Sequence, residues 1–171
     1  MKRIALILTA GIFVLLAAAL AAYLTVYGSL PDLDGEIDIA GISAPVTIER
    51  DAFGVPTIRG SNRVDVSKAT GFVHGQERFF QMDLMRRAAA GELAALMGAV
   101  AVGIDQQRRI HRFRTLAREV IANTSTLERE LLQAYAEGVN AGLEALSVVP
   151  FEYVLLQTCL LYTSPSPRDR G

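Results

Sequence analysis

The stretch RDAFGVPTIRGSNRVDVSKATGFVHGQERFFQMDLMRRAAAGELAALMG, residues 50–98, carries the strongest structural signals in the chain. Two short runs that alternate polar and apolar residues, 46–50 and 55–59, flank the loop Asp51-Ala52-Phe53-Gly54. Alternation is typical of half-buried strands, and glycine readily adopts a positive φ in a tight connection. The pattern predicts a β-hairpin with a loop of about four residues, and Pro56 assigns its second arm to an edge or a non-donating position.

A long helix is expected to follow the hairpin, with Ser61 or Asn62 as its N-cap. Gly71 and Gly75 lie four residues apart, so they share one side of this helix and permit the close approach of another element. Residues at helical spacing form an apolar stripe that three polar residues interrupt: Ala69, Phe72, Val73, Gln76, Phe80, Asp83, Leu84 and Arg87.

Asp83 needs a partner if this stripe is buried, because a buried carboxylate must be paired or hydrogen-bonded. Arg86 and Arg87 follow it by three and four residues and can reach it on the helix surface. We interpret the group as a structural ion pair at a packing interface; a direct role in substrate binding is the alternative. His74 is interpreted as a packed or surface histidine rather than a ligand.

Further helices are expected after Gly91 and Gly98, which bracket a short helical segment over residues 92–97. Asp105 is predicted to cap a second long helix, whose stripe contains Ile110, Phe113, Ala117, Val120 and Ile121. Ser125 and Glu128 form a capping box that predicts a third helix. Its stripe contains Leu132, Tyr135, Ala136, Val139, Leu143 and Leu146.

The N-terminus begins with Met1-Lys2-Arg3 and then has no charged residue from 4 to 31. The apolar run 4–26, as a helix of about 35 Å, can cross a hydrocarbon core of about 30 Å, and the basic start favours a cytoplasmic N-terminus. Residues 1–27 are therefore an uncleaved signal anchor or a signal peptide cleaved near Ala19-Leu20-Ala21. Under either interpretation, the chain after residue 27 is exported. Residues 28–35 form a turn-rich linker, and 36–39 alternate like a short strand.

Composition excludes several classes of protein. Seventeen Lys and Arg residues against 18 Asp and Glu residues give a formal charge of -1, which argues against a general nucleic-acid binder. The arginines between residues 108 and 118 are interpreted as a solvated helix face, although a basic patch is the alternative. One cysteine, Cys159, cannot form an internal disulfide, and the sequence has no Cys/His cluster at zinc spacing.

Several separated motifs, in the same order and spacing, resemble the start of the mature chain in the penicillin acylase (penicillin amidase) family. The hairpin, the segment 71–84, the arginine pair 86–87, the segment 91–98 and Tyr135-Ala136-Glu137-Gly138-Val139-Asn140-Ala141 carry the resemblance, which runs from about residue 37 to about residue 156. The structural motif residues are Arg50, Asp51, Gly54, Pro56, Gln76, Arg78, Gln81, Asp83, Arg87 and Gly91.

The resemblance implies an exported N-terminal-nucleophile hydrolase with a four-layer αββα fold. In such enzymes one precursor cuts itself into a small α chain and a large β chain. The new N-terminal serine of the β chain attacks an amide carbonyl, with its own α-amino group as base. Implied substrates are linear amides such as acylated β-lactams or N-acyl homoserine lactones. Many members bind a structural calcium, which makes calcium possible in the full-length parent.

No catalytic, substrate-binding or metal residue of the family is carried over to this chain. Residues 36–157 are expected to be a partial α chain that is inactive alone and pairs with its own β chain. The expected fold class is α+β, mostly helical with a small hairpin, preceded by a transmembrane helix. The alternative function is a membrane-anchored helical interaction module without catalysis. Residues 158–171 resemble translated sequencing adapter and are expected to be non-biological; a disordered Pro/Ser/Arg-rich tail is the alternative.

Overall fold

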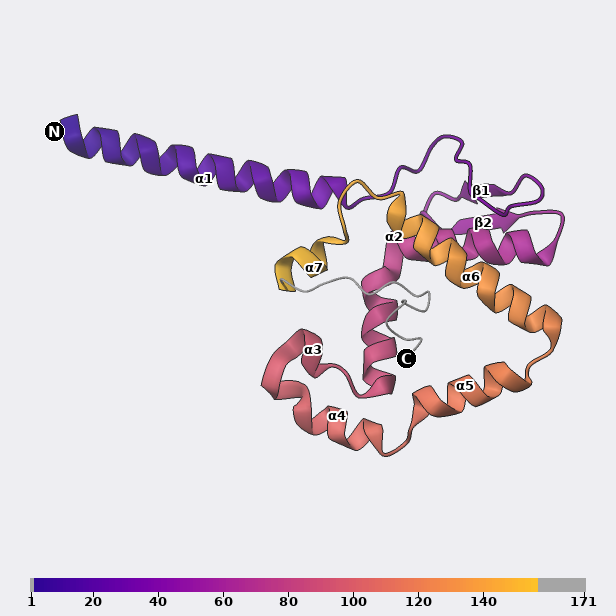
Figure 1. Ribbon diagram of the computed structural model, residues 1–171. Coiled ribbons are helices and arrows are strands. Elements are labelled where there is room, and N and C mark those ends of the chain that lie inside the picture. The colour runs from indigo at the N-terminus through magenta and orange to yellow at the C-terminus, as the bar shows by residue number, and fades with distance from the viewer. Residues whose placement is uncertain (1, 157–171) are drawn as a thin grey trace.

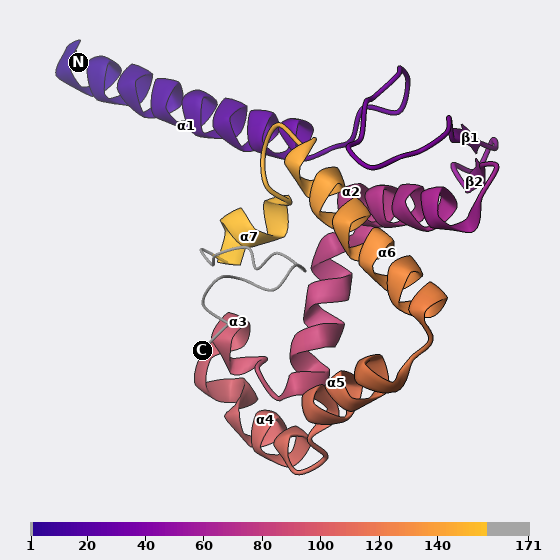
Figure 2. The ribbon, with the colours of Figure 1, turned by 45° about the vertical axis from the view of Figure 1, so that its right-hand side comes forward.

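The computed structural model describes residues 2–156 and is mostly helical, with one small sheet (Figures 1 and 2). This confirms the coarse fold expected from the sequence. The residues expected to be non-biological lie outside the described part. The elements are α1 (Lys2–Gly28), β1 (Thr47–Arg50), β2 (Pro56–Arg59), α2 (Arg63–Ala90), α3 (Ala94–Met97), the 3-10 helix η1 (Gly98–Ala101), α4 (Val102–Arg109), α5 (Phe113–Asn123), α6 (Thr126–Glu144) and α7 (Phe151–Leu156).

The predicted hairpin forms from β1 and β2, which pair antiparallel from Thr47 opposite Arg59 to Arg50 opposite Pro56. Asp51 organises the loop, because its carboxylate accepts hydrogen bonds from the backbone N–H groups of Phe53 and Val55, each at 2.9 Å. The strand expected at residues 36–39 is wrong: that segment has no regular structure. A strand needs a neighbouring ladder, and β1 and β2 pair only with each other within the described residues.

Helices α2 and α6 cross at very close range and form the centre of the domain (Figure 1). Gly71 and Gly75 of α2 meet the backbone of α6, and Gly138 and Gly142 of α6 meet the backbone of α2 in return. A Cβ atom on any of these four glycines would lie between 1.9 and 2.3 Å from a carbonyl oxygen of the other helix. The close approach predicted from Gly71 and Gly75 is therefore confirmed, and two unforeseen glycines complete it.

The core lies beside this crossing and contains the buried residues Phe79, Val139, Leu143 and Tyr153. Half-buried apolar side chains pack around it: Phe80, Met82, Tyr135 and Leu146. Tyr153 comes from α7, so this short helix is held to the domain by one of the largest fully buried side chains. The core is small, and a large part of the apolar surface elsewhere stays exposed.

Helix α2 begins at the predicted N-cap Asn62, whose side chain accepts a hydrogen bond from the Asp65 N–H at 2.8 Å. It bends at Arg78, which has non-helical angles (φ -143°, ψ 22°), and this break was not predicted. The bend brings Phe79, which lies off the predicted stripe, into the core. The helix ends at Gly91, whose left-handed conformation (φ 70°) terminates it.

The second long helix expected after Asp105 is wrong, because the structure has two shorter helices, α4 and α5, joined at a corner. Arg112 adopts a left-handed conformation there (φ 52°) and turns the chain. Asp105 lies inside α4 rather than at its start. Its carboxylate accepts hydrogen bonds from the Leu93 and Ala94 N–H groups, each at 2.8 Å, and therefore holds the start of α3. The apolar stripe on α5 faces solvent, and none of the residues of α5 is buried.

Helix α1 contains a stretch, Leu6–Gly28, that is long and apolar enough to cross a membrane, with a mean hydropathy of 2.4. Its end is joined directly to the turn between α6 and α7. The Val148 N–H donates a hydrogen bond to the Gly28 carbonyl at 3.0 Å, and Ser29 is buried. A Cβ atom on Gly28 would lie 2.8 Å from a methyl carbon of Val148, so the two segments are in tight contact.

Candidate functional site

The most buried polar group lies after the bend of α2, around Asp83, which is 1% exposed. Its Oδ2 accepts hydrogen bonds from Arg87 Nε at 2.9 Å and from the Tyr153 hydroxyl at 2.7 Å. Its Oδ1 accepts a hydrogen bond from Arg86 at 2.6 Å. The predicted ion pair is confirmed, and Tyr153 is an additional partner that lies 70 residues away in sequence. No local spacing rule could have found it.

Electrostatics keep this cluster ionised. Burial alone would raise the pKa of Asp83, but hydrogen bonds from Arg87, Tyr153 and Arg86 outweigh burial and lower the pKa below its usual 3.8. Burial, followed by the hydrogen bond to Asp83 and its negative charge, raises the pKa of the Tyr153 hydroxyl far above its usual 10.0. Tyr153 therefore stays a proton donor to a permanent carboxylate. A group whose partners hold it in this way stabilises the fold and is poorly suited to proton transfer.

A cavity of about 390 Å³ lies at the α2 bend. Three of the motif residues line it, namely Gln76, Arg78 and Gln81. Gln76 is 9% exposed, whereas Arg78 and Gln81 are exposed. Aromatic and proline side chains from α2, from the segment after α1 and from the residues at and just before the start of α7 contribute to the lining: Phe79, Phe80, Phe151, Pro31 and Pro150.

The motif residues of the hairpin face α2 and shape the loop. Arg50 forms an ion pair with Glu77 of α2 and donates a hydrogen bond to the Gly54 carbonyl at 3.3 Å. Gly54 has a positive φ of 77°, as the turn requires. Pro56 lies opposite Arg50 at the end of the ladder. The hairpin is thus attached to the helix just before its bend.

His74 contacts Tyr135 of α6, with 2.8 Å between Nδ1 and the hydroxyl oxygen. Burial, followed by the charge of Arg78, lowers the pKa of His74 below 6.5. The other histidine, His111, is exposed and stacks on Phe113. Both histidines therefore contact aromatic rings, as packed or surface residues do.

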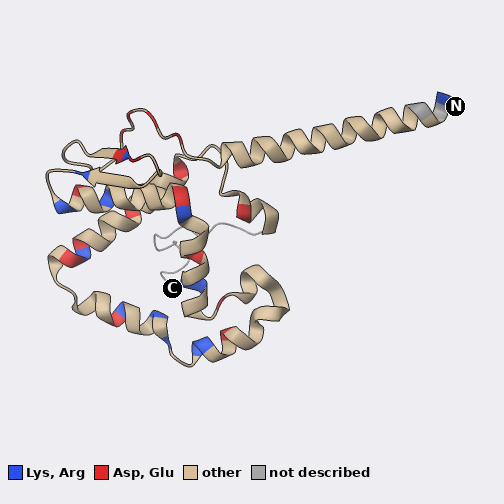
Figure 3. Ribbon diagram, turned by 180° about the vertical axis from the view of Figure 1, so that it is seen from behind, with Lys and Arg blue, Asp and Glu red and all other residues tan. Residues whose placement is uncertain are grey.

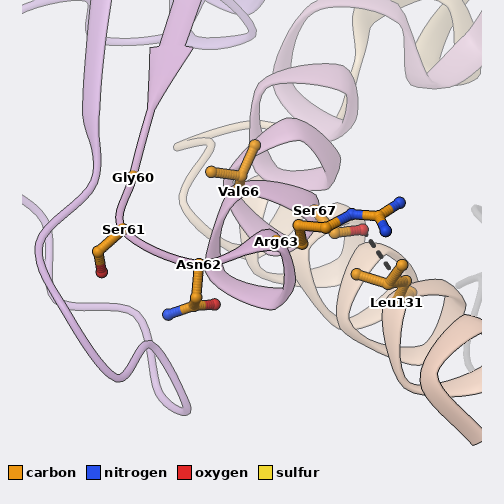
Figure 4. A pocket seen from close by; sticks show the side chains of 7 residues that line it. All are labelled: Gly60, Ser61, Asn62, Arg63, Val66, Ser67 and Leu131. Atoms are coloured by element: carbon orange, nitrogen blue, oxygen red, sulfur yellow. Dashed lines mark hydrogen bonds between the residues drawn. The ribbon is translucent and has the colours of Figure 1, made fainter.

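A second cavity, of about 380 Å³, lies at the start of α2 (Figure 4). Asn62, Arg63 and Val66 line it beside Ser67, whose hydroxyl donates to the Leu131 carbonyl at 2.8 Å. Asp65, in the same first turn of α2, is 2% exposed. Hydrogen bonds from the Ser43 N–H and hydroxyl, at 3.0 and 2.7 Å, lower the pKa of Asp65 to about 2. Sequence reasoning missed Asp65, although its place in the first turn of α2 is the usual one for a capping acid.

Chemically, these polar groups position elements rather than react. Asp65 holds the segment before the hairpin, Asp83 holds α7, and Asp105 holds α3. Within residues 2–156, no three acidic, cysteine or histidine side chains come together in a group that could hold a metal. Calcium in the full-length parent stays a prediction.

Comparison with known proteins identifies relatives of this scaffold. The family model for penicillin amidase matches residues 45–167. The penicillin acylase 2 proenzyme of Pseudomonas sp. (strain SE83) is 41% identical over 128 residues, which are 75% of this chain and 16% of that protein. The acyl-homoserine lactone acylase QuiP of Pseudomonas putida (strain KT2440) is 35% identical over 113 residues, 66% of this chain and 14% of that protein.

A solved structure agrees with these relatives. The thermostable penicillin G acylase from Alcaligenes faecalis, in its tetragonal form, superposes with a TM-score of 0.64 and 30% identity. The match covers 71% of this chain and 66% of the chain in that structure. Measured against the curated relatives, the chain spans about one sixth of their length, for example 16% of the penicillin acylase 2 proenzyme.

Proposed function

Because this chain belongs to the penicillin amidase family, we propose that its full-length parent is an exported amide hydrolase. Its substrates are linear amides such as acylated β-lactams or N-acyl homoserine lactones. The observation that carries the proposal is the family match over residues 45–167, supported by relatives named as penicillin acylases and acyl-homoserine lactone acylases. The chemistry that the family resemblance implies for such an enzyme is the attack of an N-terminal serine on the amide carbonyl.

Residues 36–157 correspond, in this proposal, to the N-terminal part of the α chain. Their polar clusters build a scaffold, because Asp65, Asp83 and Asp105 each accept hydrogen bonds that hold separate segments together. The nucleophile is supplied by a β chain that self-cleavage of the precursor releases. Residues 28–157 alone are therefore inactive.

The β chain is the proposed partner of α5. This helix is amphipathic, yet its apolar residues Phe113, Leu116, Val120 and Ile121 are all exposed. A contiguous apolar face of this kind on a soluble domain is typical of an interaction surface. The proposed β chain covers it in the assembled enzyme.

Helix α1 supports the proposed export, because it is long and apolar enough to be a membrane span near the N-terminus. Lys2 and Arg3 favour a cytoplasmic start for α1, and we propose that the domain lies on the periplasmic or outer side of the membrane. We favour an uncleaved anchor, because the apolar run continues past Ala21 to Tyr27. Cleavage of the signal would instead release the domain into the periplasm.

The test is expression of the full-length gene that contains this sequence. We expect two chains on a denaturing gel and hydrolysis of a chromogenic acyl anilide, whereas purified residues 28–157 give only the background rate. A single uncut chain without hydrolysis would contradict the proposed enzyme. Hydrolysis by residues 28–157 alone would contradict the proposal that the β chain supplies the nucleophile.

A further inference from the structure

One side of the domain combines two uncharged segments with exposed apolar side chains. Residues 94–104, which span α3, η1 and the start of α4, contain no charged residue, and α7 contains one, Glu152. The exposed apolar side chains of these segments are called the anchor-side patch: Met97, Val100, Ile104, Phe151, Val154 and Leu155. Val100 is 82% exposed and Leu155 is 77% exposed. Such residues at the surface of a soluble domain indicate a surface that contacts an apolar partner.

The segments that carry this patch lie on the side of the domain from which α1 extends. In both labelled views, α1 leaves the domain in one direction, and α7, α3 and α4 lie on that same side (Figures 1 and 2). The hairpin of β1 and β2 lies on the opposite side. The view from behind shows the same arrangement, with α3 and η1 free of charged residues (Figure 3).

The attachment of α1 fixes this geometry. The hydrogen bond from the Val148 N–H to the Gly28 carbonyl, at 3.0 Å, joins the end of α1 to the turn that precedes α7. Ser29, directly after α1, is buried, and a Cβ atom on Gly28 would lie 2.8 Å from a methyl carbon of Val148, so the end of α1 packs tightly against the domain. The direction of α1 therefore determines which side of the domain faces the membrane.

We propose that the anchor-side patch lies in the lipid–water interface of the bilayer that α1 spans. This rests on the proposed retention of α1 as an anchor. A lipid surface is the partner because the patch is apolar, has almost no charge and lies on the side of the domain from which the span extends. Tyr23 and Tyr27, whose stacked rings lie 5.9 Å apart near the end of α1, are suited to the same interface. The domain then rests on the membrane with its hairpin pointing away.

The experiment measures the depth of single labels in vesicles. The full-length parent, with any other cysteine replaced by serine, carries Val100→Cys or Leu155→Cys and an environment-sensitive fluorophore. The matched control is Phe53→Cys, at a position 93% exposed in the hairpin loop. Because all three positions are exposed, the labels do not disturb the core. Each protein is reconstituted in phosphatidylcholine–phosphatidylglycerol vesicles that contain a lipid with a quencher near its headgroup.

We expect the labels at positions 100 and 155 to lose most of their fluorescence, while the label at position 53 keeps it. Equal fluorescence at all three positions, in protein that floats with the vesicles, would overturn the proposed membrane contact and leave the anchor intact. Failure of the chain to float would refute the anchor and, with it, this proposal. Neither result bears on the amide hydrolase activity, which is measured separately.

Discussion

Substituting alanine for Gly138 tests whether backbone contact holds α2 and α6 together. The added Cβ would lie 1.9 Å from the Lys68 carbonyl oxygen and 3.0 Å from the Phe72 nitrogen. Ordinary contact begins at 3.4 Å, so rigid helices would have to separate by the difference, about 1.5 Å. Both neighbours are backbone atoms of a helix, and neither can rotate away. The separation would loosen the packing of Val139 against α2.

Overpacking of this kind costs about 1–3 kcal/mol, and more where a backbone must move, so we take about 4 kcal/mol here. The higher helix propensity of alanine offsets about 1 kcal/mol of this destabilisation. We expect Gly138→Ala to lower the free energy of unfolding by about 3 kcal/mol, measured by urea unfolding of the detergent-solubilised chain with circular dichroism.

Gly103→Ala is the matched control, because Gly103 lies in α4 with no atom within 4 Å of the added Cβ. Here only helix propensity changes, and we expect a gain of about 0.5–1 kcal/mol. A free energy of unfolding that falls for Gly138→Ala and rises for Gly103→Ala would support backbone contact between α2 and α6. A Gly138→Ala protein that unfolds at the same urea concentration as the unmodified chain would refute it.

Three further predictions concern the buried carboxylates. Tyr153→Phe removes one hydrogen bond from Asp83 and should lower the free energy of unfolding in urea by about 1–2 kcal/mol. An unchanged free energy would contradict this hydrogen bond. Because the pKa of Asp65 falls from 3.8 to about 2 on folding, its stabilisation is present above 3.8 and is lost as the pH falls through about 2. Acid titration by circular dichroism should therefore show a smaller loss of stability for Asp65→Asn; an unchanged curve would contradict this. Asp105→Ala uncaps α3, which should cost about 1 kcal/mol. Amide exchange in α3 should then accelerate, and unchanged protection would count against the cap.

Local signals in the sequence predicted the local structure well. Asn62, Ser125 and Glu128 adopt the predicted caps, because a side chain and a backbone N–H two or three residues away meet in any helix start. The spacing of Gly71 and Gly75 predicted a close neighbour, because residues four apart lie on one face of a helix.

Features that depend on distant residues could not be predicted. Asp105 looks like an N-cap in the sequence, but its carboxylate accepts hydrogen bonds from the start of α3, which precedes it by 11–12 residues. The stripe of α5 is apolar, yet it is exposed, since periodicity identifies a face without identifying what covers it. The bend at Arg78 likewise has no Pro or Gly at the break to announce it.

The α2–α6 crossing has a consequence for the order in which the chain folds. Gly71 contacts the backbone of Val139, 68 residues later, so the contact closes a long loop at an entropic cost of about 4 kcal/mol. Helix α2 leaves the ribosome with its glycine face uncovered and Asp83 without Tyr153. Its packing is completed only after residue 153 has been synthesised. The apolar surface of α2 therefore stays exposed while α3, α4 and α5 are synthesised. During this interval the nascent chain offers a chaperone the largest apolar surface.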